Sequence, residues 1–223
     1  MNNGEPLHLP IRPASREEAL RDDPLREFFV WWDDPTGNVI NEFSDLLDSA
    51  EDERPLQRFL EVHPEVLIRK LHGGHGRWCV PHKRLGSELI PDFVIGERSS
   101  MGFEWYAVEL ESPAASMFNQ ANEPSRTLNH ALTQISDWRI WLKKNIDYAT
   151  RSRNQQGLGL TDIDGDLPGI VLIGRRDKVK ADTNARRRQA CKERNVIIHT
   201  YDWLLGDQDG LPTATLGLRF RDA

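Results

Sequence analysis

Short runs of apolar residues, rich in β-branched and aromatic side chains, alternate along this chain with stretches of helical spacing. Three such runs follow one another in the middle of the sequence, near residues 76–84, 88–96 and 103–111. Runs of this length and composition predict β-strands. Three consecutive strands joined by short connections favour an antiparallel meander.

Apolar residues at helical spacing flank the three strands. Residues 51–71 predict a helix that begins with Pro55 in its first turn and is ended or kinked at Pro64. The later elements alternate in type: a helix near 125–145, a mobile loop over 150–168, a strand at 169–174, a basic helix near 182–194 and a strand at 195–200. This alternation is typical of right-handed parallel crossovers. The pattern therefore predicts an α/β fold with a three-layer αβββαβ core and a mixed sheet.

The first fifty residues differ from this core. Apolar positions between residues 22 and 50 have helical spacing, and the breaker-rich stretch 33–37 divides them into two short predicted helices. We divide the chain into an N-terminal helical extension (1–50), a core domain (51–205) and a C-terminal tail (206–223). Trp31 and Trp32 are adjacent in the extension and cannot both face one core stripe, so one of them is a candidate for a partner interface.

Composition narrows the choice of partners. The chain has 223 residues, is 38% hydrophobic and carries a net charge of −6. An acidic protein binds nucleic acid poorly without specific contacts, although a local basic groove remains compatible with that charge. The sequence shows neither a signal-peptide pattern nor an apolar run of membrane-spanning length. With two distant cysteines, Cys79 and Cys191, it predicts a cytoplasmic protein with free thiols and no membrane partner.

Three acidic residues interrupt the predicted strands. Asp92 lies in the second strand, and Glu109 and Glu111 lie at the end of the third. Glu109 and Glu111 are two residues apart, so their side chains leave the same face of a strand. If the second strand pairs alongside, three carboxylates converge and require a cation or raised pKa values. Hard oxygen ligands favour Mg²⁺ or Mn²⁺. The alternative is a solvated edge strand with Asp92 capping a turn.

The order of these elements and acids resembles the PD-(D/E)XK nuclease fold, the fold of restriction endonucleases. Pro91 and Asp92 match the acid of the second strand, Glu109 and Glu111 match the third-strand motif, and Gln134 resembles a glutamine that several such nucleases place beside the site. Within that superfamily the chain is most similar to the Shedu family of anti-phage defence nucleases. The matching segments are residues 53–64, 91–93, 108–113, 131–134, 173–175 and 200–204.

The resemblance implies a metal-dependent DNA endonuclease. It assigns Asp92, Glu109 and the Leu110 carbonyl to Mg²⁺ or Mn²⁺, with Glu111 as a third ligand or as the base that takes a proton from water. Gln134 would orient the water or a phosphate oxygen, and Glu53 or Gln57 could reach the site from the first helix. Family members act as oligomers, so the resemblance also implies a homo-oligomer.

One residue departs from the family pattern. Members usually carry a lysine two residues after the third-strand glutamate, where this chain has Glu111. Some restriction enzymes of this fold also have glutamate there and still cut DNA. The alternatives are a catalytically inactive protein that binds nucleic acid or a partner protein, and a regulatory subunit that docks through its aromatic extension.

Cleavage of double-stranded DNA requires a positive surface for the phosphates. The candidates are basic residues placed in loops or at helix starts, where binding residues concentrate. These residues are Lys83, Arg84, Arg126, Arg151, Arg153 and Arg175. Arg186, Arg187 and Arg188 of the basic helix are either a further contact surface or a solvated helix face.

Overall fold

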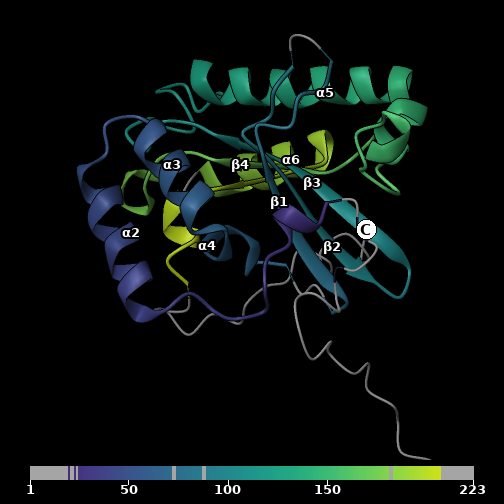
Figure 1. Ribbon diagram of the computed structural model, residues 1–223. Helices are drawn as coiled ribbons and strands as arrows, with labels where there is room; N and C mark the ends of the chain where they lie inside the picture. Colours follow the sequence, from purple (N-terminus) through teal and green to yellow (C-terminus); the bar gives the residue numbers. More distant parts are fainter. Residues whose placement is uncertain are drawn as a thin grey trace, which may run out of the picture.

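A mixed five-stranded β-sheet forms the centre of the molecule (Figure 1). The computed structural model describes residues 20 and 23 and the ranges 25–71, 74–86, 89–180 and 183–206. The strands lie side by side in chain order: β1 (Gly76–Pro81), β2 (Phe93–Ser99), β3 (Gly102–Leu110), β4 (Gly169–Leu172) and β5 (Val196–His199). The first three strands are antiparallel, whereas β4 and β5 join β3 in parallel. The predicted meander followed by parallel crossovers is confirmed.

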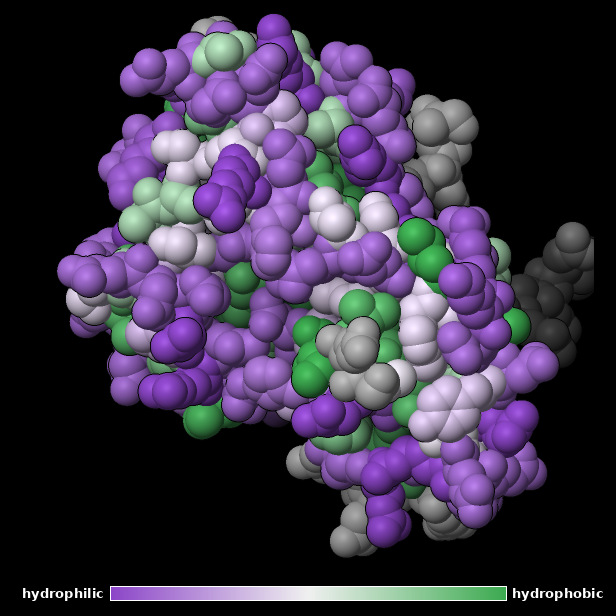
Figure 2. Space-filling model, turned by 90° about the horizontal axis from the view of Figure 1, so that it is seen from above, coloured by the Kyte–Doolittle hydropathy of each residue, from purple (hydrophilic) through white to green (hydrophobic). Residues whose placement is uncertain are grey.

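Helices cover both faces of the sheet (Figure 1). One face carries α2 (Gly37–Ser49), α3 (Arg54–Val62) and α4 (Pro64–Ile68). The other carries α5 (Arg126–Thr150) and α6 (Asn184–Arg194). Short 3₁₀ turns complete the described residues: η1 (Arg26–Phe28), η2 (Arg153–Gln155), η3 (Arg176–Lys178) and η5 (Tyr201–Trp203). Seen from the α5 side, the surface is mainly hydrophilic, with apolar residues in small patches (Figure 2).

Alternation along the strands divides the core into two clusters. Phe93, Ile95 and Val108 pack toward α2, α3 and α4. Val94 and Ala107 point the other way and pack toward α5. Because successive strand residues face opposite sides and both faces are covered, strands at the centre of the sheet are apolar without interruption.

The second strand begins later than the predicted range 88–96. β2 starts at Phe93, and Asp92 lies immediately before it. Pro91 has no backbone N–H to donate to a neighbouring strand, which is a physical reason for the later start. As a result Asp92 lies at the entrance of the strand.

The N-terminal region differs from its prediction in one of two helices. α2 is present, but the apolar residues before it form only η1. Phe29 instead makes an antiparallel bridge to Trp78, and the Val30 N–H donates to the Arg77 carbonyl at 2.9 Å. This segment therefore covers the outer edge of β1, which would otherwise expose unpaired backbone groups. Residues 1–19 of the predicted extension and 207–223 of the predicted tail lie outside the described residues.

Two helix boundaries follow directly from the sequence. The predicted helix 51–71 is broken at His63, and Pro64 begins α4, where a missing N–H costs nothing.

α2 contributes Phe43 and Leu47 to the same core cluster as Leu56 of α3, so the two helices form one layer. No helix among the described residues is both long and apolar enough to span a membrane.

Candidate active site

Asp92 connects three elements at the carboxyl end of β3. Because β2 and β3 are antiparallel, the residue before β2 lies beside the last residues of β3. The Leu110 N–H donates to Asp92 Oδ2 at 2.8 Å, and Gln57 Nε2 on α3 donates to Asp92 Oδ1 at 2.6 Å. Burial raises the pKa of Asp92 to about 6, although both hydrogen bonds favour its charged form.

Glu109 is the most deeply buried carboxylate of the site. Its side chain lies near the end of β3, is 6% exposed, and faces α5 through Gln134. Burial, followed by repulsion from Asp92 and Glu111, raises the pKa of Glu109 to about 10. Among the described residues, Glu109 Oε2 and Gln134 Oε1 are buried without a hydrogen-bond partner. Unsatisfied acceptors of this kind are uncommon and suit a missing cation or donor.

Glu111 follows β3 and is fixed at three points. Its backbone N–H donates to the Leu172 carbonyl at 2.9 Å, and its carbonyl accepts the Tyr201 hydroxyl at 2.8 Å. Its side-chain Oε1 lies 3.3 Å from Nδ1 of His130 on α5. An ionised carboxylate can only accept, so this contact requires the proton of His130 on Nδ1. The carboxylate is therefore held in place although it lies beyond the strand.

The carboxylates repel one another across this end of the sheet. Burial raises the pKa of Glu111, and Glu53 and Asp92 raise it further against the opposing effect of His130. Glu53, at the N-cap of α3, contributes in the same direction at Asp92 and Glu109. Burial, followed by these acids, also raises the pKa of the Tyr201 hydroxyl. Such mutual repulsion is relieved most directly by a cation among the carboxylates.

The donor set fits a divalent metal with few protein ligands. Within the described ranges, no three His, Cys, Asp or Glu side chains are grouped closely enough to hold a metal ion together. Mg²⁺ nevertheless is commonly bound through one or two carboxylates, with waters and substrate phosphates in the remaining positions. The buried, unpartnered Oε2 of Glu109 and its repulsion by Asp92 fit that mode better than a cage of three carboxylates.

The structure brings most of the predicted site residues together. Asp92, Glu109 and Glu111 act on one another electrostatically, Gln134 faces Glu109, and Gln57 binds Asp92 directly. Glu109 and Glu111 both face α5 and so share one side of the sheet, as their spacing predicts.

Two further residues of the site were missed from the sequence. His130 lies four positions before Gln134, hence on the same side of α5, and this spacing was a usable signal. Tyr201 reaches the site from η5 near the end of the described chain, and no local sequence pattern predicts that contact.

The predicted DNA-binding residues fall into two groups. Arg84, Arg126 and Arg151 are exposed. Lys83 donates to the Leu158 carbonyl at 2.7 Å, and burial, with a smaller effect of Arg153, lowers the pKa of its ammonium to about 8. Arg153 forms an ion pair with Glu27.

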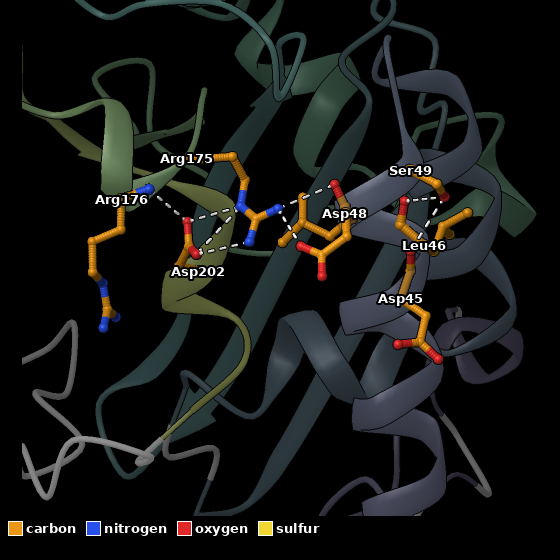
Figure 3. A network of polar contacts seen from close by, with 8 residues as sticks. Asp45, Leu46, Asp48, Ser49, Arg175, Arg176 and Asp202 are labelled. Carbon is orange, nitrogen blue, oxygen red and sulfur yellow. Dashed lines mark hydrogen bonds and ion pairs between the residues drawn. The ribbon is translucent and has the colours of Figure 1, made fainter.

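Arg175 is held by carboxylates from two other elements (Figure 3). Its Nη1 donates to Asp48 Oδ1 of α2 at 2.7 Å, and its Nη2 lies 3.3 Å from Asp202 Oδ1 of η5. The backbone N–H of Arg176 donates to the other Asp202 oxygen at 2.8 Å. The charge of Arg175 is thus engaged inside the molecule, and we treat its contact with DNA as the weakest of the predicted set.

A protein-family model matches most of this chain. The sequence model of the family described as "Shedu protein SduA, C-terminal" matches residues 50–205. This segment spans the sheet, α3 to α6 and every residue of the acidic site. No curated protein matches the chain significantly.

Proposed function

The chain belongs to the family of the Shedu protein SduA C-terminal domain, a family associated with anti-phage defence nucleases, and we propose that it is a metal-dependent DNA endonuclease. The observation that carries this proposal is the buried, unpartnered carboxylate of Glu109 near the end of β3, which Asp92 and Glu111 repel electrostatically. Three buried or half-buried carboxylates are costly to keep together without a cation. A structural role would be met at lower cost by apolar residues.

Asp92 and Glu109, with the Leu110 carbonyl, would hold Mg²⁺ or Mn²⁺. The ion supplies charge neutralisation at the scissile phosphate when it is bound. The hydrogen bonds of Asp92 to Gln57 and Leu110 fix the orientation of one ligand in advance. Such preorganisation lowers the cost of assembling the site around the metal.

Glu111 would act as the general base. It takes a proton from a water molecule, the water oxygen forms a bond to phosphorus, and the bond from phosphorus to the leaving oxygen breaks. Its side chain is already oriented by His130, which favours the role of base over that of a third metal ligand. The unpartnered Oε1 of Gln134 is an acceptor suited to orient the attacking water.

The rival function is a nuclease fold that binds without cutting. The observation that favours it is the glutamate at position 111, because a carboxylate cannot provide the positive charge of the usual lysine. Within this site the imidazole of His130 contacts the Glu111 carboxylate. The two functions differ in whether the acidic cluster supports hydrolysis.

The deciding experiment is a cleavage assay. Supercoiled plasmid, linear duplex and single-stranded DNA are incubated with the full chain in Mg²⁺, Mn²⁺ or EDTA, and with the isosteric variant Glu109→Gln. We expect cleavage in Mg²⁺ or Mn²⁺ that EDTA and the variant abolish. Absence of cleavage by folded wild-type protein, with Mn²⁺ bound, would instead support the binding function. Light scattering of the same sample tests the predicted homo-oligomer.

A further inference from the structure

Positive charge is concentrated in one short part of this acidic chain. Residues 175–194 contain nine lysines and arginines but only three aspartates and glutamates, whereas the whole chain has 29 basic and 35 acidic residues. This part includes η3 and α6, which follow β4. A surface with this charge attracts polyanions.

Four of these basic residues have exposed side chains and are together called the strip below. Lys178, Lys180, Arg186 and Arg188 are exposed, and no ion pair within the described residues engages any of them. Lys83, Arg153 and Arg175 contrast with them, because each is bound to a carbonyl or a carboxylate of the protein. These four residues therefore join the exposed Arg84, Arg126 and Arg151 as candidates for phosphate contacts, in place of Lys83, Arg153 and Arg175.

The strip lies at the same end of the sheet as the acidic site. β3 and β4 are parallel, so Glu111 and the segment after β4 leave the sheet at the same end. The Gly174 N–H donates to the carbonyl of Ser112, the residue that follows Glu111, at 3.2 Å. Lys178 and Lys180 line a shallow hollow together with Met117 and Phe118, which belong to the connection from Glu111 to α5.

The start of α6 has charges that helix stability does not explain. Arg186, Arg187 and Arg188 occupy its first two turns, and its first turn has no acidic residue. Cations at a helix N-terminus are opposed by the helix dipole, and acidic residues are the favourable choice there. α6 also buries none of its residues. The three arginines oppose the preference of a helix N-terminus for acidic residues. An anion outside the protein that they bind explains them better than helix stability does.

We propose that Lys178, Lys180, Arg186 and Arg188 bind the phosphate backbone of double-stranded DNA beside the acidic site. This proposal rests on the proposed function for the identity of the polyanion. Arg186 and Arg188 are two residues apart and leave different sides of the helix start, so a duplex that contacts both meets the N-terminal end of α6 rather than its flank. Such contacts fix the position of the duplex but carry no sequence information.

The test measures binding separately from cleavage. A fluorescent duplex of random sequence is titrated with the full chain in EDTA at several salt concentrations. Two double variants, Lys178→Gln/Lys180→Gln and Arg186→Gln/Arg188→Gln, are compared with Arg98→Gln/Lys144→Gln. The control removes two exposed charges, from the end of β2 and from the later half of α5. Circular dichroism verifies that every variant is folded.

We expect each strip variant to bind the duplex at least about tenfold more weakly at 0.1 M salt, and the slope of log Kobs against log salt to fall by about 1.8. The control should stay within about twofold of wild type. Affinities and slopes equal to those of the control would overturn the proposal. So would strip-dependent binding of heparin or RNA by a protein that leaves duplex DNA unbound. If the chain binds duplex DNA through these residues but never cleaves it, the proposed DNA contacts would be supported. Only the proposed nuclease activity would then be contradicted.

Discussion

The imidazole of His130 and the carboxylate of Glu111 face each other across the space between α5 and the end of β3. His130 Nδ1 lies 3.3 Å from Glu111 Oε1, and the histidine side chain is 68% exposed while that of the glutamate is 14% exposed. Of the two, only Glu111 occupies the position at which the resemblance predicts a lysine. The carboxylate of Glu111 is the proposed proton acceptor, and the imidazole ring of His130 fixes its orientation.

We predict that His130 is a positioning residue for Glu111. His130→Ala should lower kcat by about 10- to 100-fold with little change in KM, because the carboxylate loses its orienting donor. His130→Asn retains a donor and should recover part of the activity. The measurement is steady-state cleavage of a short duplex in Mg²⁺. A purely structural histidine would show equal losses in both variants and a lowered Tm.

Glu109→Gln should abolish cleavage and stabilise the metal-free protein. The folded-state pKa of Glu109, about 10, lies well above its ordinary value of 4.5. Between these values the unfolded chain is ionised while the folded protein keeps the proton, so metal-free wild type loses stability as pH rises. The variant lacks this loss. Its Tm advantage in EDTA should grow from pH 5 to pH 9 and reach roughly 2–8 °C. An advantage that does not change with pH would contradict the raised pKa.

Much of the site could be predicted from the sequence because the two-residue periodicity of strands determines which side chains share a face. The i, i+2 spacing places Glu109 and Glu111 on one face, and the pairing of consecutive strands brings Asp92 alongside. The contacts of Gln57 and Tyr201 depend instead on how elements far apart in sequence pack. The periodicity of residues within one helix or strand does not show how that element packs against others.

The basic residues were the least predictable part of the chain. A lysine or arginine in a loop has the same local sequence whether it faces solvent or a buried carbonyl. Arg175 is the clearest case, because its partners Asp48 and Asp202 come from opposite ends of the described chain. Their meeting is decided by tertiary packing alone. The first predicted N-terminal helix failed for the same reason, since the edge of β1 offers Phe29 and Val30 backbone partners that a short helix would lack.

Metal binding should stabilise the wild-type protein and not the Glu109→Gln variant. A ligand that binds only the folded state adds about 2.7 kcal/mol when its concentration is 100 times Kd. Mn²⁺ should therefore raise the Tm of wild type by several degrees. Ca²⁺, which is larger and prefers more oxygen ligands, should have a smaller effect at equal concentration. Calorimetric titration with Mn²⁺ provides a second readout that needs no DNA. Equal stabilisation of both proteins would place the metal elsewhere.

Arg175 should prove more important for stability than for DNA affinity. Its guanidinium is 21% exposed and joins α2 to η5 through Asp48 and Asp202 (Figure 3). Arg175→Gln leaves the half-buried Asp202 without its cation, and we expect a loss of about 1–3 kcal/mol in the free energy of unfolding. Asp48→Asn should cost less, roughly 0–1 kcal/mol, because Asp48 is mostly exposed. Urea unfolding gives both values. Duplex affinity of the folded Arg175→Gln protein should stay within about threefold of wild type, since the lost charge is already neutralised by two carboxylates. A large loss of affinity without a change in stability would instead restore Arg175 to the DNA-binding surface.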